Sequence, residues 1–329
     1  MRGAAYDRFG DLDVLTVRDD LPEPPVGPDT VLVRTHAAGV NPVDLTIRAG
    51  GLAGAFPHHF PIIPGWEVAG VVEAAGPAVH GLAPGDEVFG YVRRDDVQWG
   101  TTAELVPAPQ RCVARAPSSL SLTEGAAVPL AGLTAYLALT EALEVGEGDR
   151  VLVHRAAGGV GFFAVQIAVA LGAHVIGTAS PRNHAFLRDA GCAEVVDHAA
   201  GPVSGQLAEP VDAVLDLVGN ATLRDSLACV RPKGRVCLAG FLGGLDPVPD
   251  FNPLADLPSG VELSTFASAF VLGDDDFPLT DVPLQDIVAR AERGTYRAKP
   301  VAVFDFDAIA EAHRALETNA TPGKLVVRV

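Results

Sequence analysis

The chain is poor in cysteine and in positive charge. Its 329 residues include four cysteines, which are scattered and form no Cys-x-x-Cys motif. The sequence therefore predicts no disulfide framework and suits a reducing compartment. Lys and Arg total 24 against 41 Asp and Glu, which gives a formal net charge of −17. Because nucleic acids and acidic membrane surfaces bind basic faces, we expect neither as a partner.

Long hydrophobic runs are also scarce. Residues 1–7 contain no apolar core of the kind found in signal peptides, and we expect a cytoplasmic protein. The run 158–177 approaches the length of a membrane span, but four glycines divide it. We interpret this run as a glycine turn, a buried helix and a central strand of a parallel sheet.

The remaining pattern predicts two globular domains of mixed α/β structure. Residues 1–124 hold short extended runs between Pro- and Gly-rich turns, which predicts a partly closed β-barrel, and residues 125–144 have helical spacing. From residue 150 onward strands alternate with helices, which is typical of a doubly wound sheet. The predicted strands of that sheet are Val151–His154, His174–Thr178, Glu194–Val196, Ala213–Val218, Arg235–Ala239 and Val261–Phe266.

The C-terminal part returns to mixed structure, and we expect it to pack on the first domain. Helices are predicted at Pro283–Arg293 and Asp307–Glu317, and strands at Pro300–Phe304 and Lys324–Val329. Residues 274–276, three consecutive aspartates, are interpreted as a solvated loop.

A glycine turn follows the strand at residue 151 and opens into the helix Phe162–Leu171. Its pattern is Ala-x-Gly-x-x-Gly, and a second strand follows the helix. This strand–turn–helix–strand context seats a pyrophosphate on a helix N-terminus, and a purely structural turn is the alternative. The predicted nucleotide-binding residues of the turn are Ala156, Gly158, Gly159, Val160 and Gly161.

The end of the second strand predicts the choice of cofactor. NAD sites usually carry Asp or Glu there to accept hydrogen bonds from the ribose 2′-hydroxyl. Residues 178–184 contain no acid, but they offer Ser180 and Arg182, which suit a 2′-phosphate. We therefore predict NADPH as the cofactor; the alternative is that Arg182 is a solvated surface residue.

With these motifs in place, the chain resembles the medium-chain dehydrogenase/reductase superfamily, in its zinc-free quinone oxidoreductase branch. The resemblance implies a GroES-like barrel formed by residues 1–124 and 267–329, and a Rossmann domain formed by residues 125–266. It also implies that the nicotinamide lies in the cleft between the domains, and that the chain forms a homodimer through its last Rossmann strand. The residues that carry it are Ala38–Asp44, Pro64–Gly70, Gly85–Val88, Ala131–Tyr136, Ala156–Gly161, Ala312–Glu317 and Gly323-Lys324.

The resemblance also bears on metal binding. Zinc-dependent relatives place a Cys where this chain has Asn41 and a His where it has Trp66, so two ligands of a catalytic zinc are missing. The cysteine-rich structural zinc lobe is absent as well. We predict no metal.

Without a Lewis acid, the expected reaction is hydride delivery from NADPH to an electron-poor acceptor, either a quinone or an α,β-unsaturated carbonyl compound. The developing oxyanion needs hydrogen-bond donors. Asn41 is the leading donor, although it also suits a turn before Pro42. The family places Thr134 and Lys324 at the same cleft, and Asp44 is expected to orient backbone or substrate. Further expected cofactor contacts are Val218, Gly219, Phe241 and Lys324.

The chain departs from its relatives at three positions. Leu52 stands where many relatives carry a tyrosine that binds or protonates the substrate, and Thr102 stands where an aromatic residue is common. Arg155 precedes the glycine turn where relatives have a small residue, and it could contact the pyrophosphate or cap the strand. Because leucine at position 52 cannot supply a proton, the reduced substrate would be protonated by solvent, or the substrate would be a quinone that needs no such proton. Two alternatives stay open: a trans-acting enoyl reductase, and a nucleotide-binding protein with little catalysis.

Overall fold

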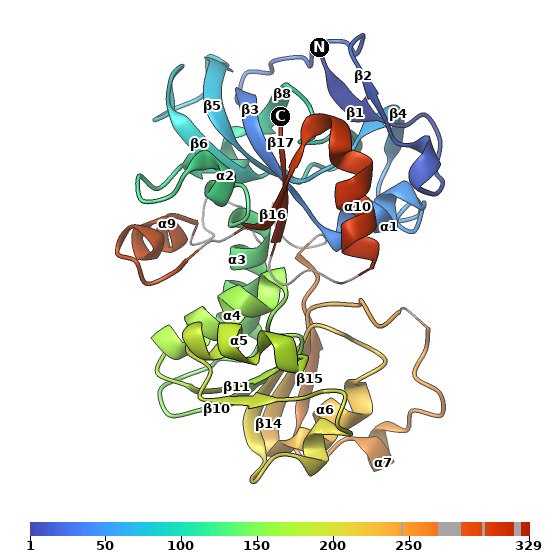
Figure 1. Ribbon diagram of the computed structural model, residues 1–329, viewed down its shortest axis with the longest axis vertical. Helices are drawn as coiled ribbons and strands as arrows, with labels where there is room; N and C mark the ends of the chain where they lie inside the picture. Colours follow the sequence, from blue (N-terminus) through green and yellow to red (C-terminus); the bar gives the residue numbers. More distant parts are fainter. Residues whose placement is uncertain (245, 269–283, 298–299, 319–323) are drawn as a thin grey trace. The chain divides into compact units, whose positions relative to one another are not determined.

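The computed structural model describes residues 1–244, 246–268, 284–297, 300–318 and 324–329 (Figure 1). The predicted aspartate loop at 274–276, Pro283 and Gly323 lie outside the described residues. The chain divides into two compact units, one of Met1–Leu130 with Ala269–Val329, and one of Ala131–Ser268. In the described part of the chain, no helix has both the length and the apolar character needed to cross a membrane.

The first unit is built on a seven-stranded sheet in the order β16-β17-β3-β5-β6-β9, with β8 also paired to β3. The sheet strands are β3 (Thr30–Val40), β5 (Glu67–Ala75), β6 (Glu87–Tyr91), β8 (Leu105–Pro109), β9 (Val113–Arg115), β16 (Pro300–Asp305) and β17 (Lys324–Arg328). Strands from both ends of the chain therefore share one sheet, as predicted for the C-terminal part. Valines from β3, β5, β6 and β8 fill its core.

Smaller elements surround this sheet. Two short ribbons pair β1 (Gly3–Ala5) with β2 (Thr16–Arg18), and β4 (His58–Ile63) with β7 (Val97–Trp99). The helices are α1 (Pro42–Arg48), α2 (Leu122–Gly125), α9 (Leu284–Glu292) and α10 (Ile309–Glu317). Helix α1 starts directly after the central strand β3, because Asp44 Oδ2 accepts the backbone N–H of Asn41 and Pro42 occupies the first helical position.

The second unit holds a six-stranded sheet in the order β12-β11-β10-β13-β14-β15, with every neighbouring pair parallel. Its strands are β10 (Arg150–Val153), β11 (His174–Thr178), β12 (Glu194–Val196), β13 (Val211–Asp216), β14 (Val230–Leu238) and β15 (Glu262–Thr265). All six predicted strands are confirmed, with shifted ends in several cases. The strand order reverses between β10 and β13, and ligands bind doubly wound sheets at the carboxyl ends of the strands beside such a reversal.

Helices accompany this sheet, and all except the short α7 fall where the sequence predicted helical segments. They are α3 (Pro129–Leu137), α4 (Gly159–Ala170), α5 (His184–Asp189), α6 (Leu223–Cys229) and α7 (Pro253–Asp256). Helix α4 is apolar on nearly every face, and its residues from Gly161 to Ala168 are all buried. The helix expected over 125–144 is not continuous, because α3 gives way to a π-helical turn at Ala138–Ala142.

Candidate functional site

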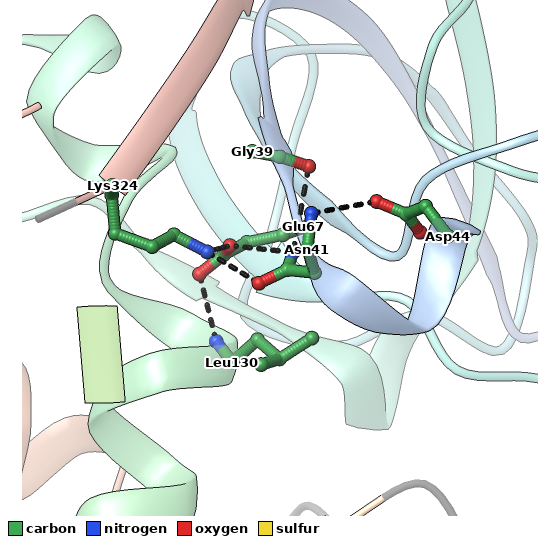
Figure 2. A network of polar contacts seen from close by, with 6 residues as sticks. All are labelled: Gly39, Asn41, Asp44, Glu67, Leu130 and Lys324. Carbon is green, nitrogen blue, oxygen red and sulfur yellow. Dashed lines mark hydrogen bonds and ion pairs between the residues drawn. The ribbon is translucent and has the colours of Figure 1, made fainter. Parts of the chain in front are cut away.

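Polar side chains meet where three neighbouring strands of the first unit begin or end (Figure 2). Lys324 begins β17, Glu67 begins β5, and Asn41 directly follows β3. The register explains the meeting, because Val40 pairs with Leu325 on one side of β3 and Gly39 pairs with Glu67 on the other. All three side chains are buried, with Lys324 6% exposed and Glu67 0% exposed.

A hydrogen-bonded network joins these three side chains. Lys324 Nζ donates to Asn41 Oδ1 at 2.5 Å and to Glu67 Oε2. Asn41 Nδ2 donates to Glu67 Oε2 at 3.1 Å and to the carbonyl oxygen of Gly39 at 3.5 Å. The lysine ammonium fixes the orientation of the amide, because exchanging its oxygen and nitrogen would direct an NH2 group at an ammonium ion.

The Glu67 carboxylate is satisfied on both oxygens. Its Oε1 accepts a hydrogen bond of 2.8 Å from the backbone N–H of Leu130, at the start of α3. The first N–H groups of a helix carry partial positive charge and favour a carboxylate. A buried ion pair holds a fold together only when its remaining hydrogen-bonding positions are filled, and this condition is met at Glu67.

Asp44 lies beside this network rather than in it. Its Oδ2 accepts the backbone N–H of Asn41 at 2.8 Å, while Oδ1 is buried with no hydrogen-bond donor among the described residues. Burial raises the pKa of Asp44 to about 7, against the opposing effects of the Asn41 hydrogen bond and the Lys324 charge. Burial, together with the nearby charge of Asp44, also raises the pKa of Tyr6.

The far end of α1 is tied to α10. Arg48 Nη1 lies 2.9 Å from His313 Nδ1, and Arg48 Nη2 donates to Glu317 Oε1 at 2.6 Å. Burial, and then the Arg48 charge, lower the pKa of His313 to about 3, so the ring is neutral and accepts at Nδ1. This contact fixes the helix that follows Asn41 against the helix that precedes Lys324 in the chain.

An aromatic cluster occupies the position where zinc-dependent relatives have a histidine. Trp66 is buried, and its ring packs edge-on to Phe56 at 6.3 Å and against Tyr91 at 6.1 Å between centroids. Such rings offer no metal ligand. Within the described ranges, no group of three or more His, Cys, Asp or Glu residues could hold a metal ion.

In the second unit the glycine turn has the geometry that a phosphate requires. Gly158 precedes α4 without a side-chain cap, and the first backbone hydrogen bond of the helix runs from Phe162 N to Gly158 O. The N–H groups of Gly159, Val160 and Gly161 therefore lie ahead of that first helical bond. A Cβ on Gly161 would lie 2.7 Å from Ala156 Cα, so only glycine fits. The turn therefore suits a dinucleotide pyrophosphate.

A second loop follows β13 at the carboxyl edge of the same sheet. Asp216 accepts the N–H groups of Val218 at 2.8 Å and Gly219 at 2.9 Å, and it also accepts the hydroxyl groups of Thr222 and Ser226. Gly219 has φ +95°, and a Cβ there would lie 3.2 Å from Phe241 Cα. The predicted contacts Val218, Gly219 and Phe241 are thus neighbours.

The ends of β11 and β12 place a third set of polar groups together. Ser180 Oγ lies 3.3 Å from His198 Nε2, and Arg182 is exposed in the short turn at Pro181–Asn183.

Thr134 is buried on α3 in this unit, and its catalytic role remains a prediction. Sequence reasoning named neither Glu67 nor Asp216 nor His198 as a site residue. Asp216 lies within a predicted strand, Ala213–Val218, and ends the observed β13, whereas the roles of Glu67 and His198 depend on pairing between strands.

Arg155 stands directly before the glycine turn in a left-handed conformation, with φ +53°. Its side chain lies over the turn, since a Cβ on Gly158 would lie 3.5 Å from Arg155 Nε. Burial lowers the pKa of Arg155, and the residue is half-buried.

Two families of protein domain match parts of the chain. The alcohol dehydrogenase GroES-like domain matches residues 27–118, and the zinc-binding dehydrogenase family matches residues 190–327. The human quinone oxidoreductase is 30% identical over 334 residues, which cover 99% of this chain and 97% of that protein.

Other similarities extend to polyketide synthases and to a solved structure. The spectinabilin polyketide synthase system protein NorB of Streptomyces orinoci is 35% identical over 92% of this chain, but the chain spans only 13% of that protein. The crystal structure of the Escherichia coli quinone oxidoreductase complexed with NADPH matches with a TM-score of 0.86 and 25% identity, over 100% of both chains.

Proposed function

The chain belongs to the medium-chain dehydrogenase/reductase superfamily, in its quinone oxidoreductase-like branch, and from this premise we propose that it is an NADPH-dependent reductase of quinones or α,β-unsaturated carbonyl compounds. The membership confirms the predicted fold class, a GroES-like partly closed β-barrel with a doubly wound Rossmann domain, and it confirms that the chain is an oxidoreductase. The proposed domain limits are 1–124 with 267–329, and 125–266.

The observation that carries the proposal is the fit of the glycine turn to a phosphate. Gly161 leaves no space for a side chain, and three N–H groups precede the first helical hydrogen bond. We infer that the residues from Ala156 to Gly161 bind the pyrophosphate and that Ser180 and Arg182 bind the 2′-phosphate. Val218, Gly219 and Phe241 would line the remainder of the dinucleotide, in the loops that follow β13 and β14.

The acceptor would be held by residues of the first unit. When bound, NADPH supplies a hydride to the acceptor. Asn41 and Lys324 would form the polar edge of the acceptor site, and Asp44 would hold the backbone at Asn41. Thr134, in the second unit, is proposed as a further catalytic residue. A proton from solvent would complete the reduction, because Leu52 replaces the tyrosine of many relatives. The acceptor is a small molecule in this proposal, and the protein is a cytoplasmic homodimer paired through β15, without a bound metal.

A second candidate function is supported by the similarity to NorB. That polyketide synthase protein suggests an enoyl reductase that acts in trans on a tethered intermediate, although the chain spans only 13% of it. Both candidates use the same cofactor, and they differ only in the acceptor.

Turnover separates the candidates. The rate of NADPH absorbance loss would be measured with 1,4-benzoquinone, a simple cyclic enone and an enoyl thioester. Faster oxidation with the quinone or the enone supports the first candidate, and a marked preference for the thioester supports the second. Binding of NADPH without faster oxidation by any acceptor would contradict both and leave a nucleotide-binding protein with little catalysis.

A further inference from the structure

We propose that Lys324 is the catalytic residue that donates a hydrogen bond to the carbonyl oxygen of the acceptor, and that Asn41 and Glu67 are positioning residues that hold its ammonium group. This inference rests on the proposed function. It assigns to Lys324 the donor role that the sequence favoured for Asn41.

The Asn41 amide is already committed within the protein. Its oxygen accepts from Lys324 Nζ at 2.5 Å, and its nitrogen faces Glu67 Oε2 at 3.1 Å and Gly39 O at 3.5 Å. Offering an N–H group to a substrate would require Asn41 to give up its contact with a buried carboxylate. Leaving such a group unsatisfied is costly, so the amide is better suited to holding its neighbours than to meeting an acceptor.

Lys324 is in the opposite situation. An ammonium group has three N–H donors, and among the described residues it uses two, one to Asn41 Oδ1 and one to Glu67 Oε2. One N–H remains for a ligand. The side chain is held at a defined point, because its two partners come from neighbouring strand ends and are themselves anchored, Glu67 by Leu130 N–H and Asn41 by Asp44.

Burial gives this donor its strength. Lys324 is 6% exposed and Glu67 is 0% exposed, so water screens their charges poorly. The pair is close to neutral as a unit, which allows it to be buried. Negative charge that develops on an oxygen beside the ammonium is then stabilised by a donor that needs no rearrangement during the reaction.

Reduction of an enone would combine hydride transfer with protonation. The β-carbon gains a hydride, and the electron pair of the C=C bond moves through the conjugated system to the carbonyl oxygen. Lys324 donates its free N–H to that oxygen and keeps its proton. A proton from water then adds to the α-carbon, which leaves the saturated ketone and NADP⁺.

The test separates cofactor affinity from the chemical step. NADPH binding to Lys324→Met would be measured by nucleotide fluorescence, and single-turnover reduction of the enone would be followed at saturating NADPH. Loss of one such donor lowers the chemical rate about 100- to 1,000-fold. We expect that loss with a dissociation constant for NADPH within about 3-fold of the unaltered protein, and partial recovery of the rate in Lys324→Arg, which still offers N–H donors.

Two further variants keep the test interpretable. Lys324→Met alone leaves the Glu67 charge buried and unpaired, so the double variant Lys324→Met with Glu67→Gln removes both charges together. The exposed Lys233→Met is the matched control, and it should change neither quantity.

The inference is overturned if the dissociation constant rises while the rate at saturation is unchanged, which would make Lys324 a cofactor-binding residue only. It is also overturned if neither quantity changes, which would make the ion pair purely structural. The absence of NADPH binding by the unaltered protein would instead contradict the proposed function and this inference with it.

Discussion

Gly39 and Glu67 face each other across β3 and β5, and the glycine leaves the space that the glutamate carboxylate occupies. A Cβ on Gly39 would overlap Glu67 Oε2 and would lie 2.6 Å from the carbonyl oxygen of Ala126. The side chain of Glu67 is fixed by hydrogen bonds on both oxygens, so it cannot move aside without losing them. A glycine in the strand is therefore a condition for the buried network with Lys324.

The first prediction concerns this glycine. Gly39→Ala should lower the free energy of unfolding by about 1–3 kcal/mol, the usual cost of forcing extra volume into a packed interior. Urea unfolding followed by circular dichroism measures the change. Gly54→Ala is the matched control, because a Cβ at Gly54 has no atom within 4 Å, and it should be nearly neutral. Equal stability of the two variants would show that the network tolerates the added methyl group.

The second prediction concerns pH and Asp44. Because the pKa of Asp44 is raised to about 7 in the folded protein, the native state binds a proton that the unfolded chain has already released. Its contribution to stability is complete below the unfolded pKa and is lost as the pH rises to about 7.

The unfolding free energy of Asp44→Asn, relative to that of the unaltered protein, should therefore rise between about pH 4 and pH 7. The gain cannot exceed about 1.4 kcal/mol per pH unit for one proton. Asparagine keeps an oxygen for the N–H of Asn41, so the helix cap survives. A difference that stays constant with pH, measured by urea unfolding at several pH values, would mean that Asp44 is ionised in the folded protein.

The third prediction concerns selection of the cofactor by Arg182. Removing a charge-assisted hydrogen bond costs about 1.5–3 kcal/mol, so Arg182→Ala should weaken NADPH binding about 10- to 100-fold. Binding of NADH, which lacks the 2′-phosphate, should hardly change. Calorimetric titration of both nucleotides provides the comparison. An equal loss for the two would remove Arg182 from the phosphate site.

The fourth prediction resolves the role of Arg155, for which the sequence left two possibilities. The side chain lies over Gly158 and its backbone is in a left-handed conformation, which disfavours a non-glycine residue. Arg155→Gly should relieve that conformation and, by removing a cation beside the turn, raise the dissociation constant of NADPH about 10-fold or more.

Lys233 supplies the control for this substitution. It has φ +64° and is exposed, so Lys233→Gly also removes one cation from a left-handed position. Its NADPH affinity should match that of the unaltered protein. If Arg155→Gly binds NADPH equally well, the arginine serves only to finish the strand.

Local sequence signals were enough for part of the fold. Strands β11 and β12 have the predicted limits, because each is a short apolar run bounded by turn residues. Strand β3 is longer than the short extended runs predicted for residues 1–124, and it reaches Val40 because β17 pairs with its last residues. That pairing joins opposite ends of the chain, and no local pattern reveals it. Strand β14 likewise starts at Val230 rather than Arg235, across an irregular pairing with β13.

The candidate site shows the same division. The glycine turn and Asn41 could be predicted from local motifs, since turn and capping residues are determined by their neighbours in sequence. The contact of Glu67 with Lys324 joins residues 257 positions apart, so it follows only from the order of strands in the sheet. The sequence therefore predicted Asn41 as the hydrogen-bond donor to the acceptor, whereas the proposal based on the structure assigns that role to Lys324.

Calorimetric titration of NADPH into the purified, unaltered protein tests the central claim most directly, because every role proposed for the turn at Ala156–Gly161 requires a bound dinucleotide. We predict saturable binding of one NADPH per chain, tighter than the binding of NADH. A titration that shows no binding of NADPH would contradict the account.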